Sequence, residues 1–145
     1  VLLTTDHGMS PTDPKNTTYL NLEFPELIPM LDSSQKGHPL VPAGGCRDFF
    51  LHLKEDKLQD AISLLQEPLA EKAEVHKVHD LLEAGFFGHS VSENLRSRIG
   101  NLVILPYYGE SVWWYEKNRF EQNMLGHHGG LTRQEMEIPL LALCL

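Results

Sequence analysis

The stretch Val1-Leu2-Leu3-Thr4-Thr5-Asp6-His7-Gly8-Met9-Ser10 decides the fold, because an apolar run stops there at a carboxylate, an imidazole and a glycine. A short apolar, β-branched run is typical of a strand buried on both faces. Ligand sites of open α/β sheets gather beyond the carboxyl ends of the strands. Carboxylate oxygen and imidazole nitrogen are both zinc ligands. The stretch therefore predicts an α/β fold with a divalent metal site at the tip of its first strand.

A second motif, Gly126-His127-His128-Gly129-Gly130, lies near the other end of the chain. Its glycines allow the backbone to pass close to an ion or a phosphate. Adjacent histidines in a turn point in different directions, so one of them is expected to bind and the other is not. Taken alone, each motif has an ordinary alternative: a turn carboxylate with a surface imidazole at Asp6 and His7, and an exposed histidine pair in a glycine-rich loop.

The remaining sequence alternates strand and helix signals. Apolar positions alternate in the strand candidates and recur at helical spacing in the helix candidates. Ser90 and Glu93 have the spacing of a capping box, as do Thr132 and Glu135, and Gly109 indicates a hairpin or a tight bend. The expected elements are an irregular loop at 10–25, strands at 1–5, 47–54, 74–78, 102–105, 111–116 and 138–145, and helices at 56–69, 81–82, 90–99 and 132–135.

Four segments in order resemble one family. Thr4-Thr5-Asp6-His7-Gly8-Met9 resembles the metal-binding "S/T-D-H-G-M" of the alkaline phosphatase superfamily, closest to its type I phosphodiesterase and nucleotide pyrophosphatase branch. Residues 98–105 resemble the family's "R-x-G-D-L-V-V-L" strand, with Asn101 in place of the usual Asp. Residues 126–132, followed by Glu135-Met136 and by 138–141, resemble its "HGG-L-T-x-E-E-M-x-x-P-L-L" ending.

The resemblance implies an alkaline phosphatase-like α/β core with a mostly parallel sheet flanked by helices. We expect residues 1–43 and 106–145 to belong to the C-terminal part of this core, and residues 44–105 to form an inserted small α/β segment. The apolar runs at both ends lead us to expect a piece of a longer enzyme, since domain boundaries usually fall in polar linkers.

The resemblance also implies site residues. Asp6 and His7 would belong to the metal that holds the nucleophile, and His128, the histidine directly before the paired glycines, to the partner metal. His127 and Gly8 would support these ligands. The nucleophile and the other ligands lie upstream in relatives, so no catalytic residue is expected in this chain, which alone should be inactive and should bind metal weakly or not at all.

The implied activity of the parent is hydrolysis of phosphate diester or pyrophosphate bonds with two divalent ions, zinc first and manganese or magnesium as alternatives. A phosphomutase, a phosphonoacetate hydrolase or a sulfatase would share the same ligands. A different class of function is a non-catalytic module that self-associates through exposed strand edges. The expected partner is a small phosphodiester or a nucleotide.

Composition excludes several classes. The net charge of -8 over 145 residues disfavours binding of a nucleic acid polymer, whose phosphates need basic side chains. No run approaches the roughly 20 apolar residues of a membrane-spanning helix, and no secretory signal is apparent, so we expect a cytoplasmic protein without membrane contact. Cys46 and Cys144 show no metal or disulfide spacing and are expected to be small buried side chains.

Other residues have weaker alternative roles. His76 and His79 form an H-x-x-H without an obvious third zinc ligand. Tyr107, Tyr108 and the run 113–115 could stack on a nucleobase or pack as core. Arg47, Arg96 and Arg98 could meet a substrate phosphate or form salt bridges.

Overall fold

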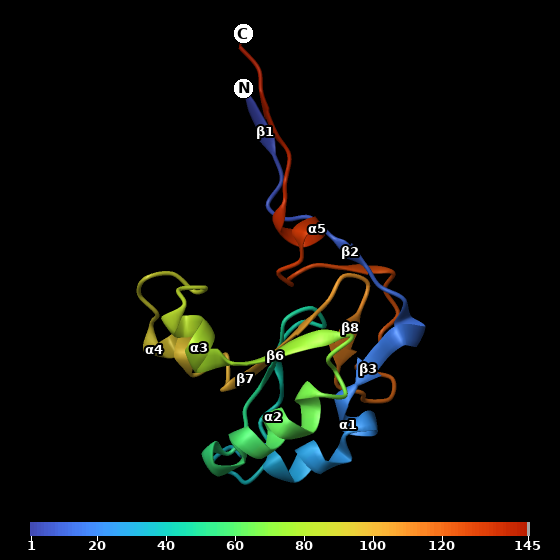
Figure 1. Ribbon diagram of the computed structural model, residues 1–145, viewed down its shortest axis with the longest axis vertical. Coiled ribbons are helices and arrows are strands. Elements are labelled where there is room, and N and C mark those ends of the chain that lie inside the picture. The colour runs from blue at the N-terminus through green and yellow to red at the C-terminus, as the bar shows by residue number, and fades with distance from the viewer. Residues whose placement is uncertain (145) are drawn as a thin grey trace.

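The computed structural model describes residues 1–144 as a mixed α/β chain of short strands and helices, which confirms the predicted α/β class. In Figure 1 a compact body carries a long two-stranded extension, at whose tip the two termini lie together. The elements in chain order are β1 (Leu2–Thr4), β2 (Ser10–Pro11), η1 (Pro14–Asn16), β3 (Thr17–Tyr19), α1 (Leu20–Glu23), η2 (Pro25–Met30), β4 (Ala43–Gly44), β5 (Phe49–Leu51), η3 (Glu55–Lys57), α2 (Leu58–Gln66), β6 (Ala73–Lys77), α3 (Val78–Glu83), α4 (Glu93–Arg96), β7 (Leu102–Pro106), β8 (Ser111–Trp113), β9 (Gly126–His127), α5 (Arg133–Met136) and β10 (Leu140–Ala142).

The central sheet has the strand order β4-β5-β7-β6, and every neighbouring pair in it is antiparallel. The only parallel pair in the described part of the chain is β3 with β8. The prediction of a mostly parallel sheet is therefore wrong for these residues. The parallel direction was implied by the family resemblance, and the apolar runs could not test it, because they report burial of both faces and not strand direction.

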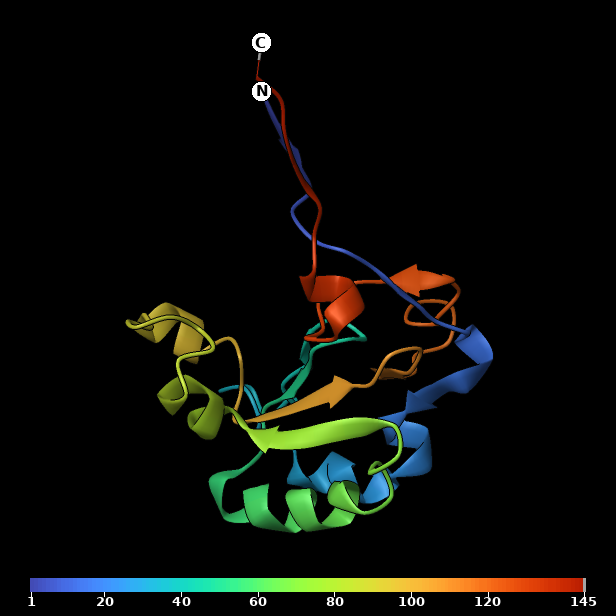
Figure 2. The same cartoon turned by 45° about the horizontal axis from the view of Figure 1, so that its top comes forward.

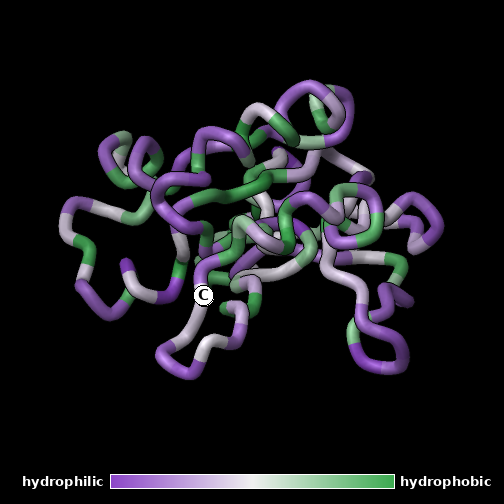
Figure 3. Tube along the Cα trace, turned by 90° about the horizontal axis from the view of Figure 1, so that it is seen from below, coloured by the Kyte–Doolittle hydropathy of each residue, from purple (hydrophilic) through white to green (hydrophobic). Residues whose placement is uncertain are grey.

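Both faces of β7 are indeed buried. Leu102 and Ile104 belong to one hydrophobic cluster, which includes side chains of α1, η2 and α2, and Val103 belongs to a second, beneath α3. Figure 2 shows α1, η2 and α2 together on one side of the sheet, and Figure 3 shows the apolar segments concentrated in the middle of the body. Because both faces of β7 are covered, its sequence is apolar at every position and does not alternate with polar residues.

The first cluster also includes Leu20, Leu27, Leu31 and Val112, which lie outside residues 44–105. The segment 44–105 thus supplies the sheet but shares its core with the flanking residues. Its assignment as an insertion between the core segments 1–43 and 106–145 remains a prediction.

Asn101 joins β5 to β7 with its side chain. Its amide oxygen accepts the Leu53 N–H at 2.9 Å, and its amide nitrogen donates to the Leu53 carbonyl at 2.8 Å. A carboxylate could not donate the second bond. Asparagine is therefore suited to this position as a structural residue.

Some predicted elements differ in detail. The helix expected from Ser90 is only α4, and its N-cap is Ser92, whose hydroxyl accepts the Leu95 N–H at 3.2 Å. Gly109 lies in a tight bend with φ 85°, but β7 and β8 do not form a hairpin, since β8 pairs with β3. The expected loop at 10–25 contains β2, β3 and α1, because Thr17 and Thr18 are buried against β8.

The extension, which we call the arm, consists of β1 paired antiparallel with β10 and is closed by a bond from the Val1 amino group to the Leu143 carbonyl. Leu2 and Leu3 are 72% and 62% exposed, and Leu140 is 67% exposed. The predicted burial of the first and last strands is therefore not observed, because the two strands have only each other as sheet neighbours. The final residue of the expected strand 138–145, Leu145, lies outside the described residues.

Two smaller predictions also have outcomes. Cys46 is buried as expected, whereas Cys144 is exposed at the end of the arm. None of the helices formed by residues 1–144 is long and apolar enough to cross a bilayer.

Candidate metal centre

The two predicted motifs meet in space. The His7 and His128 rings are stacked, with centroids 3.7 Å apart and an angle of 15° between their planes. A short antiparallel pair of β2 with β9, in which Ser10 is opposite His127, holds the two segments together beside the rings. The tertiary fold thus brings together the first strand tip and the late glycine bend, as the sequence predicted.

Asp6 and His7 face a common space although they are sequence neighbours. The Asp6 carboxylate oxygen lies 3.8 Å from Nε2 of His7, and the Asp6 side chain is 87% exposed. Backbone N–H groups, first that of Asp6 itself, and the nearby His7 ring hold the pKa of Asp6 below its usual value. An ionised carboxylate beside an imidazole nitrogen is a donor pair that fits a zinc ion.

The His7 tautomer also fits metal binding. Nδ1 of His7 lies 2.8 Å from the Gly8 carbonyl, which can only accept a hydrogen bond, so Nδ1 carries the proton when the ring is neutral. Nε2 is then left with its lone pair. Metal-binding histidines commonly donate their other ring N–H to a backbone carbonyl in this way.

The donor set is incomplete in this chain. Among residues 1–144, no three His, Cys, Asp or Glu side chains are arranged to hold one ion. Asp6 with His7 and, separately, His128 are fewer donors than a zinc site uses.

His127 differs from its neighbour. Its Nε2 is buried and has no hydrogen-bond partner among the described residues, and the ring lines a cavity of about 350 Å³ together with Cys46. Burial, and then the charge of Arg47, lower the pKa of His127. His127 is thus a neutral, inward-facing neighbour of the centre.

Position 8 requires glycine because the backbone of α5 approaches it closely, and not because of an unusual backbone angle. A Cβ at Gly8 would lie 1.9 Å from the Gln134 carbonyl oxygen, and the Gly8 N–H donates to the Glu135 carbonyl at 2.8 Å. Helix α5 therefore packs directly on the Asp-His-Gly tip. Sequence reasoning anticipated a flexible turn at Gly8 but not this contact.

A buried ion pair lies beneath the centre. The Arg47 and Glu135 side chains are 0% and 1% exposed, and Arg47 Nη2 is 2.8 Å from Glu135 Oε2. The salt-bridge alternative for Arg47 is therefore the observed one. Glu135 accepts from the Thr132 hydroxyl and the Gly130 N–H instead of reaching back as a capping-box side chain. The helix nevertheless begins after Thr132 as predicted.

Asp48 is a second carboxylate that sequence reasoning missed. It accepts the Gly45 N–H at 2.8 Å, and its Oδ1 lies 3.1 Å from the place where a Cβ on Gly129 would be. Burial raises the pKa of Asp48, while the nearby His128 acts to lower it. No local pattern in the sequence marks Asp48, because its approach to the glycine bend depends on the tertiary fold.

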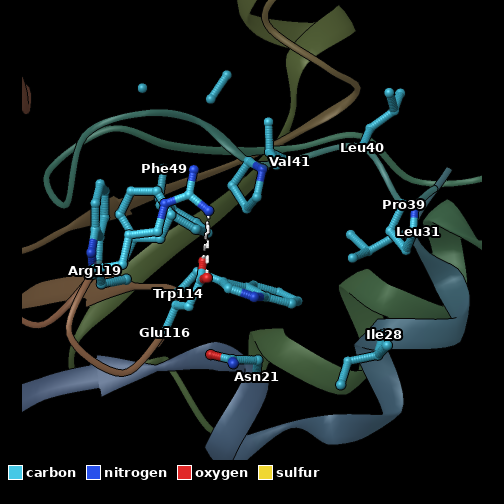
Figure 4. A pocket seen from close by; sticks show the side chains of 15 residues that line it. Asn21, Ile28, Leu31, Pro39, Leu40, Val41, Phe49, Trp114, Glu116 and Arg119 are labelled. Carbon is cyan, nitrogen blue, oxygen red and sulfur yellow. Dashed lines mark hydrogen bonds and ion pairs between the residues drawn. The ribbon is translucent and has the colours of Figure 1, made fainter. Parts of the chain in front are cut away.

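The other candidate residues lie elsewhere. His76 pairs with Glu74 at 2.8 Å and His79 with Glu83 at 3.3 Å, so the H-x-x-H motif forms two separate surface contacts. Trp113 packs on Phe49 and, with Trp114, lines a mostly apolar cavity of about 510 Å³ that also holds the Arg119–Glu116 ion pair (Figure 4). No predicted metal ligand is among the described residues that line this cavity.

The buried carboxyl predicts a pH dependence. Burial alone would raise the pKa of Glu135, but hydrogen bonds from Arg47, Thr132 and Gly130 outweigh it and hold the pKa below the usual 4.5. The stabilisation from ionised Glu135 is complete above its unfolded pKa and is lost as the pH falls through the folded pKa.

We therefore expect the difference in unfolding free energy between the wild type and Glu135→Gln to be constant near neutral pH and to shrink below about pH 4.5. Urea titrations monitored by fluorescence at several pH values measure this difference. A difference that stays the same down to about pH 3 would contradict the lowered pKa.

Solved structures share this fold. Murine ectonucleotide pyrophosphatase/phosphodiesterase 5 has a TM-score of 0.62 and 18% identity over 96% of this chain, and the human protein has 0.58 and 19% over 94%. Phosphonoacetate hydrolase from Sinorhizobium meliloti 1021 has 0.60 and 17% over 97%. An inactive variant of the murine protein was solved in complex with AMP.

This chain covers 32%, 32% and 35% of the murine, human and bacterial chains, so it spans about a third of their length. No protein-family model and no curated protein matches its sequence. The likeness confirms the predicted fold: the chain has the architecture of one part of these larger proteins.

Proposed function

We propose that this chain is the C-terminal part of a metal-dependent phosphodiesterase or nucleotide pyrophosphatase of the alkaline phosphatase superfamily. The observation that carries the proposal is the stacking of His7 on His128, which come from the two motifs that resemble the family's metal-binding segments. The shared fold supports the same assignment.

In the parent, Asp6 and His7 would hold one divalent ion, and His128 the other. Two such ions, zinc first and manganese or magnesium as alternatives, would supply charge stabilisation to the attacking and leaving oxygens of the phosphoryl group. The Nδ1–H bond from His7 to the Gly8 carbonyl orients Nε2 for its role. Gly129 and Gly130 lack a Cβ, which lets the bend beside His128 approach the carboxylates of Asp48 and Glu135 closely.

The nucleophile and the remaining ligands would come from parts of the parent outside this chain. The isolated chain should therefore be inactive and bind metal weakly, because two donors hold an ion less tightly than three or four. A small phosphodiester or a nucleotide is the proposed substrate, and no nucleic acid polymer. Phosphomutase, phosphonoacetate hydrolase and sulfatase activities use the same ligands and are the neighbouring alternatives.

We expect Asp6→Ala and His128→Ala to lower kcat/KM of the longer parent for a nitrophenyl phosphodiester, with added zinc or manganese, by at least about 100-fold, since even residues that only support a metal ligand cost 10–100-fold. His79→Ala is the matched control, because this exposed histidine pairs only with Glu83. Absence of turnover by the wild-type parent with either metal would reject the proposed function.

The exposed arm supports a second candidate function, that of an interaction module. Leu3 and Leu141 are opposite each other in the β1–β10 pair and are 62% and 56% exposed. Each strand has a free outer edge as well as exposed apolar side chains, and such edges pair readily with other strands. In the parent, further strands could cover the same edges.

We expect the isolated chain to self-associate through the arm as its concentration rises in sedimentation velocity. Leu3→Glu combined with Leu141→Glu should shift it to the monomer, whereas Leu22→Glu, an exposed leucine of the body, should not. A wild-type chain that remains monomeric at all concentrations would count against the module.

A further inference from the structure

One residue, Glu135, forms hydrogen bonds with both segments of the candidate centre, the one that carries His7 and the one that carries His128. Its main-chain carbonyl accepts the Gly8 N–H at 2.8 Å, next to His7. Its carboxylate Oε1 accepts the Gly130 N–H at 3.0 Å, in the bend that carries His128. The two segments that present the stacked rings are therefore attached to the same residue of α5.

Arg47 fixes this residue to the body of the molecule. Its Nε and Nη2 donate to the two Glu135 oxygens at 3.0 Å and 2.8 Å. Its Nη1 donates to the Tyr107 carbonyl at 2.8 Å and also to the Glu110 carbonyl. A planar guanidinium bound on both edges has little freedom to move. The position of Glu135 is thus set by the β4–β5 and β7–β8 connections and not by the arm.

The glycines next to the histidines fit this arrangement. A Cβ on Gly130 would lie 2.7 Å from Glu135 Oε2, and one on Gly8 would lie 1.9 Å from the Gln134 carbonyl. Both glycines therefore have α5 as their neighbour. A helix that touches both segments at once can hold them at a fixed separation.

We infer that Glu135, anchored by Arg47, is a positioning residue that sets the separation of His7 and His128. Its consequence for metal binding rests on the proposed function, but the positioning itself is a property of the chain without metal. The carboxylate is needed as such, because each of its oxygens accepts one N–H of Arg47. A glutamine side chain would place its NH₂ group against an Arg47 N–H in either orientation.

The test is the NMR spectrum of the histidine rings in the metal-free chain. Ring protons of His7 and His128 carry a ring-current shift from stacking, and the eight histidine signals are assigned with His7→Gln and His128→Gln. We expect Glu135→Gln to abolish this shift while the signals of His76 and His79 stay in place. Glu137→Gln, which loses only an exposed pair with Arg133 on the same helix, should leave the shift unchanged.

A second variant keeps the test decisive if Glu135→Gln does not fold. Arg47→Met with Glu135→Leu removes both charges and keeps an apolar filling, an exchange that proteins often tolerate. We expect this folded double variant to lose the ring-current shift as well, and metal-dependent hydrolysis by the parent to fall at least tenfold. A folded double variant that retains the shift overturns the inference.

The readouts separate the two proposals. If the parent hydrolyses no phosphodiester but Glu135→Gln still abolishes the shift, the proposed function fails and the positioning role stands. If hydrolysis depends on Asp6 and His128 but the shift survives in both Glu135 variants, the positioning role fails alone.

Discussion

Alanine at Gly100 is expected to cost about 3–5 kcal/mol of unfolding free energy, one of the largest losses that a single methyl group can cause in this chain. Gly100 has φ 62°, and a Cβ there would lie 2.2 Å from the Leu51 carbonyl oxygen. That carbonyl accepts the Asn101 N–H at 3.1 Å, at the junction of β5 and β7. The methyl group must displace β5, whose Leu51 is fully buried.

Gly85→Ala is the matched control. Gly85 has φ 81°, but a Cβ there would meet nothing within 4 Å, so this variant should cost only the left-handed conformation, about 1–2 kcal/mol. Urea unfolding followed by tryptophan fluorescence gives both values, and their difference isolates the steric contact. Equal losses in the two variants would show that β5 does not approach Gly100 as closely as described.

Arg47→Met is expected to lower the unfolding free energy by a similar amount, about 3–5 kcal/mol, because it leaves the buried Glu135 carboxylate without its partner. Glu135 is 1% exposed, and the carbonyls of Tyr107 and Glu110 would also lose their donor. The loss is measured by the same urea titration, near neutral pH, where Glu135 is ionised in the wild type.

A second substitution, at the partner Glu135, provides the control. Adding Glu135→Leu to Arg47→Met should recover most of the loss, since an apolar pair of similar volume is often neutral in stability. Arg133→Met breaks an exposed pair with Glu137 and should stay within about 0.5 kcal/mol of the wild type. A loss for Arg47→Met no larger than for Arg133→Met would mean that the buried pair is open in solution.

Several elements could be predicted from the sequence because their signals are local. The helix predicted at 56–69 corresponds to α2, and the strands predicted at 74–78 and 102–105 correspond to β6 and β7. The pairing of these strands was not predictable from the same signals. A run buried on both faces has the same pattern in a parallel and an antiparallel sheet, so it could not test the parallel sheet that the resemblance implied. The central sheet is antiparallel.

The features of the candidate centre were likewise only partly predictable from the sequence. His7 and His128 were predicted to approach each other from the two motifs, and their rings are stacked. Arg47 was left between a phosphate contact and a salt bridge, and its buried partner Glu135 was quoted only for its helix and motif position. Asp48 carried no signal of its own, because its proximity to the glycine bend arises only when β5 packs beside it.

The sequence by itself determined which residue types are available for chemistry, and it predicted that the Asp6-His7 tip and the distant histidine-glycine bend meet, as the stacked rings of His7 and His128 do. Only the tertiary structure decided how they are held: by α5, through the Glu135 carbonyl on one side and its carboxylate on the other. The physical reason is that periodicity and motif spacing are properties of neighbouring residues, whereas a buried ion pair between positions 47 and 135 exists only when folding removes both side chains from water.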